Sequence, residues 1–368
     1  MILYLGVGLV LLIIGAEGLV RGATALAGRA GIPPLLIGLT VVALGTSSPE
    51  VVVTVHAALD GHPDLAMGNV VGSNLFNGLF ILGLAALFGP LKVTLPVIQR
   101  DVPLLIAASL LVLGLSLNGS LGRGEGVVLL TMAVVYTLHL AGAGIRASRA
   151  DADLTSAAGK GSRMREAYPG ILPSLLLSVG GVVGLAWGAS WVVQGASGIA
   201  ETFGVPEPIV GLTVLAAGTS LPEVATALVA GLRGRGDLAV GSVVGSNLYN
   251  LFLVLGAGAV LAPGALPVAE SLIAFDLPLM LAAAVALLPF AATGHRIDRW
   301  EGAVFLFYWF AYLTLLLLEV MGHPVRDTLW ILFVAFLVPI TLMTLVVVGA
   351  RMAGRGQTST NTGEKGQA

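Results

Sequence analysis

Long apolar stretches, each about the length of a membrane-spanning helix, follow one another along almost the whole chain. A helix needs about 20 mostly apolar residues to cross the hydrocarbon core of a bilayer. Polar residues gather in the short connections between these stretches. The pattern therefore predicts an all-α polytopic membrane protein with eleven spans, at residues 2–20, 33–59, 64–88, 101–118, 125–144, 169–196, 206–231, 237–262, 270–291, 301–319 and 329–350.

Positive charges fall almost entirely on one side of this arrangement. Cytoplasmic loops of membrane proteins carry an excess of Lys and Arg. With the N-terminus outside, the inside loops collect 16 of the 18 Lys and Arg residues, and only Arg123 and Arg326 lie outside. We therefore predict a multi-pass protein of the inner (cytoplasmic) membrane, with its N-terminus outside and its C-terminus inside. No basic segment precedes the first span, so we interpret it as retained rather than cleaved.

Composition agrees with the membrane assignment and excludes other classes. The chain is 57% hydrophobic and 10% charged, whereas soluble domains carry about 25% charged residues. Its 50 glycines are typical of helices that pack closely in lipid. The absence of cysteine excludes disulfides and thiolate metal sites. A net charge of −2 without a basic tract gives no indication of nucleic-acid binding. We also expect no cofactor.

Two segments of the chain are copies of one another. Residues 38–83 and 211–256 align without a gap at an offset of 173, with 27 identities in 46 positions. Weaker matches extend the copies to five predicted spans each. Because five is odd, the second copy enters the membrane inverted. Inverted repeats with broken helices that meet at mid-membrane are typical of secondary transporters.

The duplication predicts four parts of the chain, two of which are the repeats. A hydrophilic inside linker separates the repeats, and an extra span with a cytoplasmic tail follows the second. The predicted boundaries are 1–143 for the first repeat, 144–168 for the linker, 169–319 for the inverted repeat and 320–368 for the C-terminal part.

One glutamate lies near the middle of an apolar span in each copy, Glu50 in the first and Glu223 in the second. A charged side chain at the bilayer centre costs about 2.5–3.5 kcal/mol on insertion scales. No Lys or Arg lies within any predicted span, so the protein offers no counter-charge there. The structural interpretation is a carboxyl that is kept neutral or paired elsewhere. We favour the functional one, in which the partner is a mobile cation.

Hydroxyl and amide side chains accompany each glutamate at helical spacing. A threonine lies four residues before each glutamate, and therefore on the same helix face. Pro49 and Pro222 lack an N–H and interrupt the helix beside the glutamates, which exposes backbone carbonyls. On the next span, a serine and an asparagine are again four apart. The repeated polar residues are Thr46, Ser73 and Asn77 in the first copy and Thr219, Ser246 and Asn250 in the second.

This inventory of ligands contains oxygen only. Oxygen ligands suit hard cations such as Ca²⁺ and Na⁺ and argue against Zn²⁺ or copper. Ca²⁺ takes six to eight oxygens in a flexible shell, whereas Mg²⁺ demands near-ideal octahedral geometry. The charges of two glutamates balance one Ca²⁺. The residues therefore favour a Ca²⁺ site shared by the two copies.

Two motifs occur twice, G-T-S-x-P-E at Gly45–Glu50 and Gly218–Glu223, and G-S-N-x-x-N at Gly72–Asn77 and Gly245–Asn250. They resemble the repeat signature of the cation/calcium antiporter superfamily, and most closely its prokaryotic sodium/calcium exchangers. The resemblance extends to about residue 319. It implies exchange of about three Na⁺ for one Ca²⁺ by alternating access, with the first and sixth spans sliding over the core. The residues that it implies as ligands are Glu50, Glu223, Thr46, Thr219, Ser47, Ser220, Ser73, Ser246, Asn77 and Asn250, with the carbonyls of Ala43 and Ala216.

Two features depart from the family pattern. Asn250 stands where several relatives, including the potassium-dependent branch, carry Asp, and this predicts transport without K⁺. The span 329–350 adds an eleventh to the ten of the family core, and we interpret it as an anchor.

The most favoured function is therefore an electrogenic, K⁺-independent Na⁺/Ca²⁺ antiporter, with Ca²⁺ and Na⁺ as substrates and the lipid bilayer as partner. A Ca²⁺/H⁺ antiporter on the same scaffold stays open, because a carboxyl removed from water binds a proton readily. A cation channel is less favoured, because inverted repeats with broken helices indicate alternating access. An intramembrane protease is disfavoured, since no His accompanies Ser47 or Ser220 in the motif. We expect no enzymatic activity, and the sequence does not determine the oligomeric state.

Overall fold

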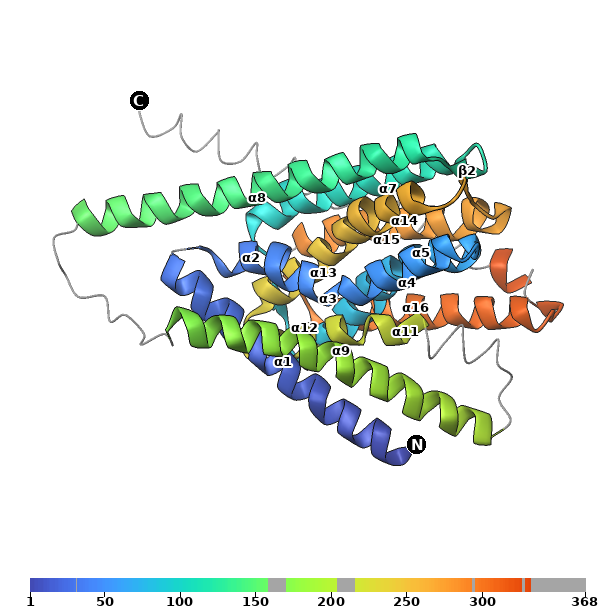
Figure 1. Ribbon diagram of the computed structural model, residues 1–368, viewed down its shortest axis with the longest axis horizontal. Helices are drawn as coiled ribbons and strands as arrows, with labels where there is room; N and C mark the ends of the chain where they lie inside the picture. The colour runs from blue at the N-terminus through green and yellow to red at the C-terminus, as the bar shows by residue number, and fades with distance from the viewer. Residues whose placement is uncertain (31, 158–169, 204–215, 293–294, 326–327, 332–368) are drawn as a thin grey trace, which may run out of the picture.

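The computed structural model describes residues 1–30, 32–157, 170–203, 216–292, 295–325 and 328–331. Helices make up nearly all of these residues, and the long ones run lengthwise through an elongated bundle (Figure 1). Within the described ranges, eight helices are long and apolar enough to cross a membrane, or nine with one bent pair included. The predicted all-α membrane fold is confirmed.

The elements of the first repeat follow the predicted spans. Several spans contain a π-helical turn, labelled η, which is a feature common at functional sites. In chain order they are α1 (Ile2–Ala30), α2 (Pro34–Ile37), η1 (Gly38–Val42), α3 (Ala43–Thr46), α4 (Ser48–Leu59), α5 (Pro63–Leu75), η2 (Phe76–Ile81), α6 (Leu82–Phe88), β1 (Leu91–Lys92), η3 (Val97–Asp101), α7 (Val102–Ser116), β2 (Ser120–Leu121) and α8 (Arg123–Ala157).

The described part of the second repeat reproduces this order, with π-helical turns that match η2 and η3. Its described elements are α9 (Ile171–Thr202), α11 (Ala216–Thr219), α12 (Leu221–Leu232), α13 (Gly236–Tyr249), η5 (Asn250–Val254), α14 (Leu255–Leu261), β3 (Leu266–Pro267), η6 (Leu272–Asp276), α15 (Leu277–Ala292), β4 (Arg296–Ile297) and α16 (Arg299–Val320).

Two helices continue past the apolar stretches that the prediction used as spans. Helix α1 extends to Ala30, and α8 runs to Ala157 through the first part of the predicted linker. Of the predicted span 206–231, the structure describes the part from residue 216. The eleventh span, 329–350, and the tail lie outside the described residues except at 329–331.

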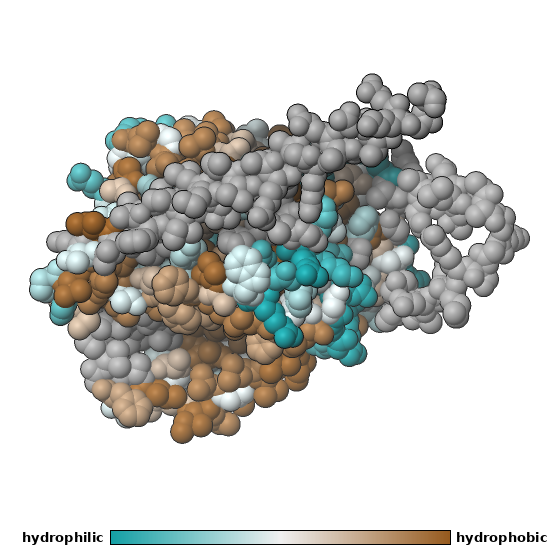
Figure 2. All heavy atoms as spheres, turned by 180° about the vertical axis from the view of Figure 1, so that it is seen from behind, coloured by the Kyte–Doolittle hydropathy of each residue, from teal (hydrophilic) through white to brown (hydrophobic). Residues whose placement is uncertain are grey.

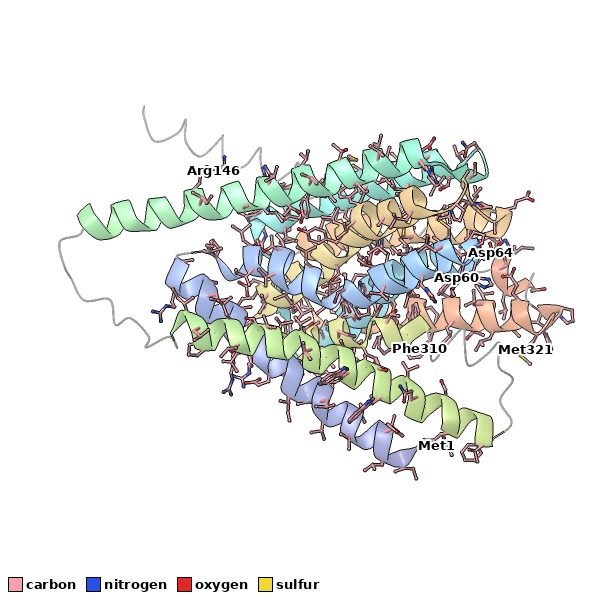
Figure 3. All side chains as sticks on the ribbon, viewed as in Figure 1. Met1, Asp60, Asp64, Arg146, Phe310 and Met321 are labelled. Carbon is pink, nitrogen blue, oxygen red and sulfur yellow. The ribbon has the colours of Figure 1, made fainter. Side chains whose placement is uncertain are left out.

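The ends of the spans lie where an alternating path through the membrane would put them. Met1, Asp60, Asp64 and Met321 lie toward one end of the bundle, and Arg146 lies toward the other (Figure 3). The predicted span order places the first four on one side of the membrane and Arg146 on the opposite side. The positions of these residues therefore agree with the predicted order of spans. Which side faces the cytoplasm stays a prediction.

The two repeats interlock rather than forming separate bodies. Helix α6 packs on α16, and its repeat counterpart α14 packs on α8. Helix α7 packs on its own counterpart, α15. The four two-residue strands among the described residues also pair across the repeats, with β1 antiparallel to β4 and β2 antiparallel to β3. The sequence did not predict these strands, because two residues are too few for a period-two pattern.

Helices α1 and α9 form an antiparallel pair with very close backbones, on one side of the bundle (Figure 1). Glycines seven residues apart line the contact on both helices. A Cβ added to Gly15 would lie 2.8 Å from the backbone nitrogen of Leu185, and one added to Gly181 would lie 2.5 Å from that of Leu19. Small residues that admit such close approach drive helix packing in lipid, where apolar burial gives little driving force.

The outward surface carries many large apolar side chains. Figure 2 shows hydrophobic residues over much of the face seen from behind, with hydrophilic ones gathered in a smaller area. Ile2, Leu3, Val52, Leu138 and Trp187 are all well exposed. In water such a surface would cause aggregation, whereas in a bilayer it contacts the acyl chains.

We predict that Gly181→Leu disrupts the α1–α9 pair, since the new side chain would meet the backbone of Leu19. Overpacking of this kind costs about 1–3 kcal/mol and often more against backbone. The thermal unfolding temperature of the detergent-solubilised protein should fall. Gly180→Leu is the matched control, because nothing lies within 4 Å of a Cβ at Gly180. Equal unfolding temperatures for the two variants would contradict this account of the packing.

Candidate functional site

The second span is broken in the middle of the bundle, as the motif predicted. Segments 35–46 and 48–59 meet at an angle of 44°, and Ser47 lies between them with φ −79° and ψ 4°. Ser220 occupies the same position between α11 and α12, with φ −90° and ψ 7°. Each following helix carries a proline in its first turn, where a missing N–H costs no hydrogen bond.

The break places one glutamate in the first turn of each following helix. Glu50 lies near the start of α4 and Glu223 near the start of α12. The N-terminus of a helix carries a partial positive charge that favours a carboxylate. Both side chains are buried, at 0% and 1% exposure. No ion pair between described residues includes either of them, so the helix ends supply only part of the charge balance.

Serines from the opposite repeat hold the two carboxylates together. Ser220 of the second repeat donates to Oε1 of Glu50 at 3.0 Å. Ser47 of the first repeat donates to Oε1 of Glu223 at 3.3 Å. The two bonds are related by the repeat, since each serine precedes the glutamate of its own copy by three residues. The structure thus brings both G-T-S-x-P-E motifs into one site.

Helices α5 and α13 carry the remaining predicted ligands to the same place. Ser73 lies 3.3 Å from the hydroxyl of Ser220, and Ser246 donates to Oε1 of Glu223 at 3.3 Å. The π-helical turns η2 and η5 contain Asn77 and Asn250, both at 0% exposure. Ser73 and Ser246 therefore belong to the same buried cluster, and Asn77 and Asn250 are buried one helical turn farther along.

The two threonines differ in their surroundings. Thr46 is buried, and its hydroxyl lies 3.4 Å from that of Ser246. Thr219 is half-buried, and it donates to Oδ1 of Asn69 at 3.4 Å. The repeat symmetry of the site is therefore imperfect at this position.

Several buried oxygens in the cluster have no hydrogen-bond partner among the described residues. Buried polar atoms are nearly always paired, so a group of unpaired ones calls for an explanation. These atoms are electron-rich acceptors, which are the kind of atom that binds a cation. The oxygens are Oε2 of Glu50, Oε2 of Glu223, Oδ1 of Asn77 and Oδ1 of Asn250.

The backbone carbonyls of Ala43 and Gly45 beside the break already accept hydrogen bonds within the protein, which the sequence did not predict. The carbonyl of Ala43 accepts the N–H of Ser47 at 3.0 Å and the hydroxyl of Thr46 at 3.3 Å. The carbonyl of Gly45, four residues before Pro49, accepts the hydroxyl of Ser48 at 2.7 Å. Ala216 begins α11 at the matching position of the second repeat. A role for the two alanine carbonyls stays a prediction.

Sequence reasoning missed three asparagines at the edge of the cluster. Asn69 donates to the carbonyl of Glu50 at 3.3 Å and to the hydroxyl of Thr54 at 2.9 Å. It has no counterpart in the duplication, because the matching residue is Ser242. Asn74 and Asn247 bond to each other across the repeats. Their place in both G-S-N-x-x-N motifs was the signal that could have identified them.

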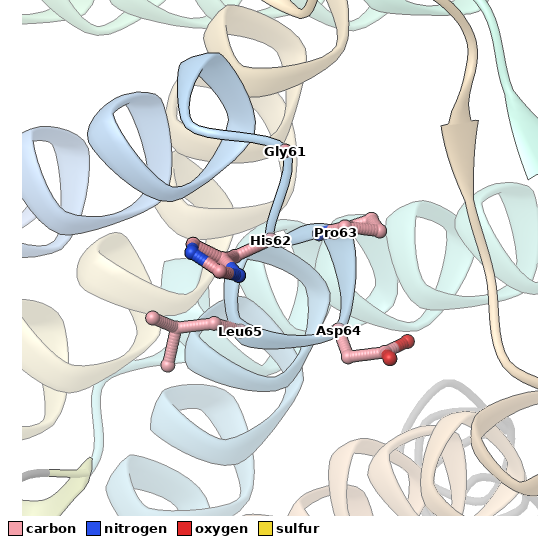
Figure 4. Close-up of a pocket in the computed structure, with 5 residues that line it drawn as sticks. All are labelled: Gly61, His62, Pro63, Asp64 and Leu65. Atoms are coloured by element: carbon pink, nitrogen blue, oxygen red, sulfur yellow. The ribbon is translucent and has the colours of Figure 1, made fainter.

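A surface hollow at the turn between α4 and α5 is separate from this cluster. It is lined by Gly61, His62, Pro63, Asp64 and Leu65, and the side chains of His62 and Asp64 point to different sides (Figure 4). In the part of the chain that the structure describes, no group of three or more His, Asp or Glu side chains could hold a metal. The buried carboxylate pair is thus the stronger candidate site.

Comparison with known proteins agrees with this geometry. The family model described as sodium/calcium exchanger protein matches residues 1–142 and 173–318. The chain belongs to the sodium/calcium exchanger protein family. It is therefore a multi-pass membrane transporter of the cation/Ca²⁺ antiporter type and not an enzyme, as its sequence predicted.

Individual relatives in this family match over most of their length. The sodium/calcium exchanger MaX1 of Methanosarcina acetivorans is 34% identical over 346 residues, which cover 85% of this chain and 97% of the relative. The inner membrane protein YrbG of Escherichia coli is 39% identical over 259 residues, or 70% and 79% of the two chains. A solved structure of the sodium-calcium exchanger NCX_Mj has a TM-score of 0.72 at 27% identity and covers 85% of this chain and 97% of that one.

We predict that Glu50→Gln and Glu223→Gln each lower Na⁺-dependent Ca²⁺ transport about a hundredfold or more. The amide keeps the shape of the side chain but removes one of two charges, and a hundredfold change equals about 2.7 kcal/mol. Folding should not suffer, because removal of an unpaired buried charge relieves its desolvation cost. Uptake of ⁴⁵Ca²⁺ into proteoliposomes measures the effect.

Asp64→Asn is the matched control, since this carboxylate is exposed on the surface turn. It should transport at the wild-type rate. Near-normal transport by either glutamine variant would show that the two-carboxylate site is wrong.

Proposed function

We propose that the protein is a Na⁺/Ca²⁺ antiporter whose transported ions bind between Glu50 and Glu223. One observation supports this most strongly: two buried carboxylates face one cluster without a cationic side chain among the described residues. One Ca²⁺ would neutralise both charges. The neutral oxygens of the serines, threonines and asparagines would complete its shell of six to eight ligands.

The same cluster would accept Na⁺ in place of Ca²⁺. Na⁺ is a hard cation that also prefers oxygen ligands, and the carboxylates attract it. The hydroxyls beside each carboxylate favour Na⁺ over H⁺ as the coupling ion, because a proton needs no coordination shell. Competition of the two ions for shared oxygens would couple their movements, so that the site carries one kind of ion in each direction.

Alternating access would use the elements that position the site. The ligands lie at helix breaks in the core, and the α1–α9 pair packs beside these breaks. The glycines of α1 and α9 face each other, which joins the two helices closely into one unit. This supports movement of α1 and α9 over the core, as the family resemblance implies.

The expected location is the inner membrane, with the N-terminus outside and the C-terminus inside. The excess of Lys and Arg in the predicted inside loops supports this orientation. The name of the E. coli relative, an inner membrane protein, supports the location. The repeats 1–143 and 169–319 would then have opposite orientations in the bilayer.

The direct test compares driving gradients in proteoliposomes that contain the purified protein. A Na⁺ gradient, but not a pH gradient of equal size, should drive ⁴⁵Ca²⁺ uptake. Replacing K⁺ with choline on both sides should leave the rate unchanged, because Asn250 offers a neutral oxygen where an additional cation would need a charge. Uptake driven by the pH gradient alone would instead favour the Ca²⁺/H⁺ antiporter. Conductance without coupling would favour a channel.

We also predict that exchange is electrogenic. If about three Na⁺ cross for each Ca²⁺, one net charge moves per cycle, which is worth about 2.3 kcal/mol per 100 mV. A negative interior should then accelerate Na⁺ entry and Ca²⁺ exit. Flux measured at clamped potentials checks this, and a rate independent of voltage would indicate a neutral cycle of two Na⁺ per Ca²⁺.

A further inference from the structure

The amide pair Asn74 and Asn247 joins the two repeats beside the carboxylates. The two residues are equivalent under the repeat offset of 173. Nδ2 of Asn74 donates to the backbone carbonyl of Asn247 at 3.3 Å, and Nδ2 of Asn247 donates to that of Asn74 at 3.3 Å. Both side chains are buried. These reciprocal bonds determine where the oxygen of the Asn74 amide points.

The oxygen of Asn74 accepts a hydrogen bond from a predicted ligand. Nδ2 of Asn250 donates to Oδ1 of Asn74 at 3.1 Å. An amide carries one donor and one acceptor group, so a fixed nitrogen also fixes the oxygen. Oδ1 of Asn250 is then left buried and without a partner. It is one of the unpaired oxygens that a cation would satisfy.

Among the described residues around Asn74, no hydrogen-bond donor would stabilise its amide in the rotated orientation. A small cavity beside the pair is lined mainly by apolar groups from α7 and α15, with Ser109 and Met280 as its other polarisable members. The hydroxyl of Ser109 is engaged with the carbonyl of Leu105 at 2.9 Å. Met280 offers only a sulfur, 3.6 Å from Nδ2 of Asn74. Rotation of the Asn74 amide would therefore leave its oxygen without a donor there.

The other half of the site lacks the equivalent bond. Oδ1 of Asn247 and both amide atoms of Asn77 have no partner among the described residues. The orientation of Asn250 is thus determined by a neighbour, while that of Asn77 is not. Asn74 therefore orients the amide of Asn250 but not that of Asn77, although the two predicted ligands are chemically identical.

We propose that Asn74 is a positioning residue for ion binding. It holds the Asn250 amide by its nitrogen, so that the carbonyl oxygen, rather than the N–H₂ group, faces the transported cation. Without Asn74, the amide would rotate freely and present its partially positive nitrogen to the ion for part of the time. The inference rests on the proposed function, because it assumes that the cluster binds Ca²⁺.

The test uses an aspartate at position 250, since a carboxylate presents an oxygen in either orientation and needs no positioning. Ca²⁺ binding to the purified full-length protein is measured by calorimetry in a double-mutant cycle. Asn74→Ala alone should weaken Ca²⁺ binding about tenfold. In the background of Asn250→Asp, the same substitution should cause no further weakening.

The matched control is Asn77→Asp, which makes the same chemical change in the half of the site that Asn74 does not contact. In that background, Asn74→Ala should keep its full effect. Equal weakening in both backgrounds, or none in the wild-type background, would overturn the proposal. If Asn74→Ala does not fold, Asn74→Ser takes its place in the cycle. A wild-type protein that binds no Ca²⁺ would instead overturn the proposed function itself.

Discussion

The structure depends on one electrostatic constraint, the burial of two carboxylates that form no ion pair with any of the described residues. Desolvation of an ionised carboxylate costs several kcal/mol unless charges or hydrogen bonds compensate it. Glu50 and Glu223 receive one helix N-terminus and serine donors each, which satisfy one oxygen and leave the other unpaired. A protein that transports a divalent cation needs this incomplete compensation, because full compensation would leave no affinity for the ion.

The inverted duplication explains how this constraint is met. A single broken helix supplies one carboxylate, and its counterpart in the second repeat supplies the other. Because Ser47 bonds to Glu223 and Ser220 bonds to Glu50, neither repeat forms the site alone. The interlocked packing of α6 on α16 and of α8 on α14 keeps the two halves in register. The α1–α9 pair meets through glycines, which leaves its contact with few side chains.

The sequence was sufficient to predict the spans that the structure describes, the broken helices, and the glutamates and serines that bond to one another across the repeats. The length of the apolar stretches predicts the spans. A proline beside a charged residue in the middle of a span predicts a broken helix. The ends of α1 and α8 were not predictable from hydropathy, since helices can continue into polar segments. Asn69 was missed because it has no repeat counterpart. The bond between Asn74 and Asn250 depends on the packing of α5 against η5, which no local pattern encodes.

The location of the bound ion tests the central claim most directly. Crystals of the protein, grown without Na⁺ and soaked in Ca²⁺, would reveal the ion by its anomalous scattering. The account predicts one Ca²⁺ that is coordinated at about 2.3–2.6 Å by oxygens of both Glu50 and Glu223. A fully occupied Ca²⁺ in the membrane core that contacts neither carboxylate would contradict it.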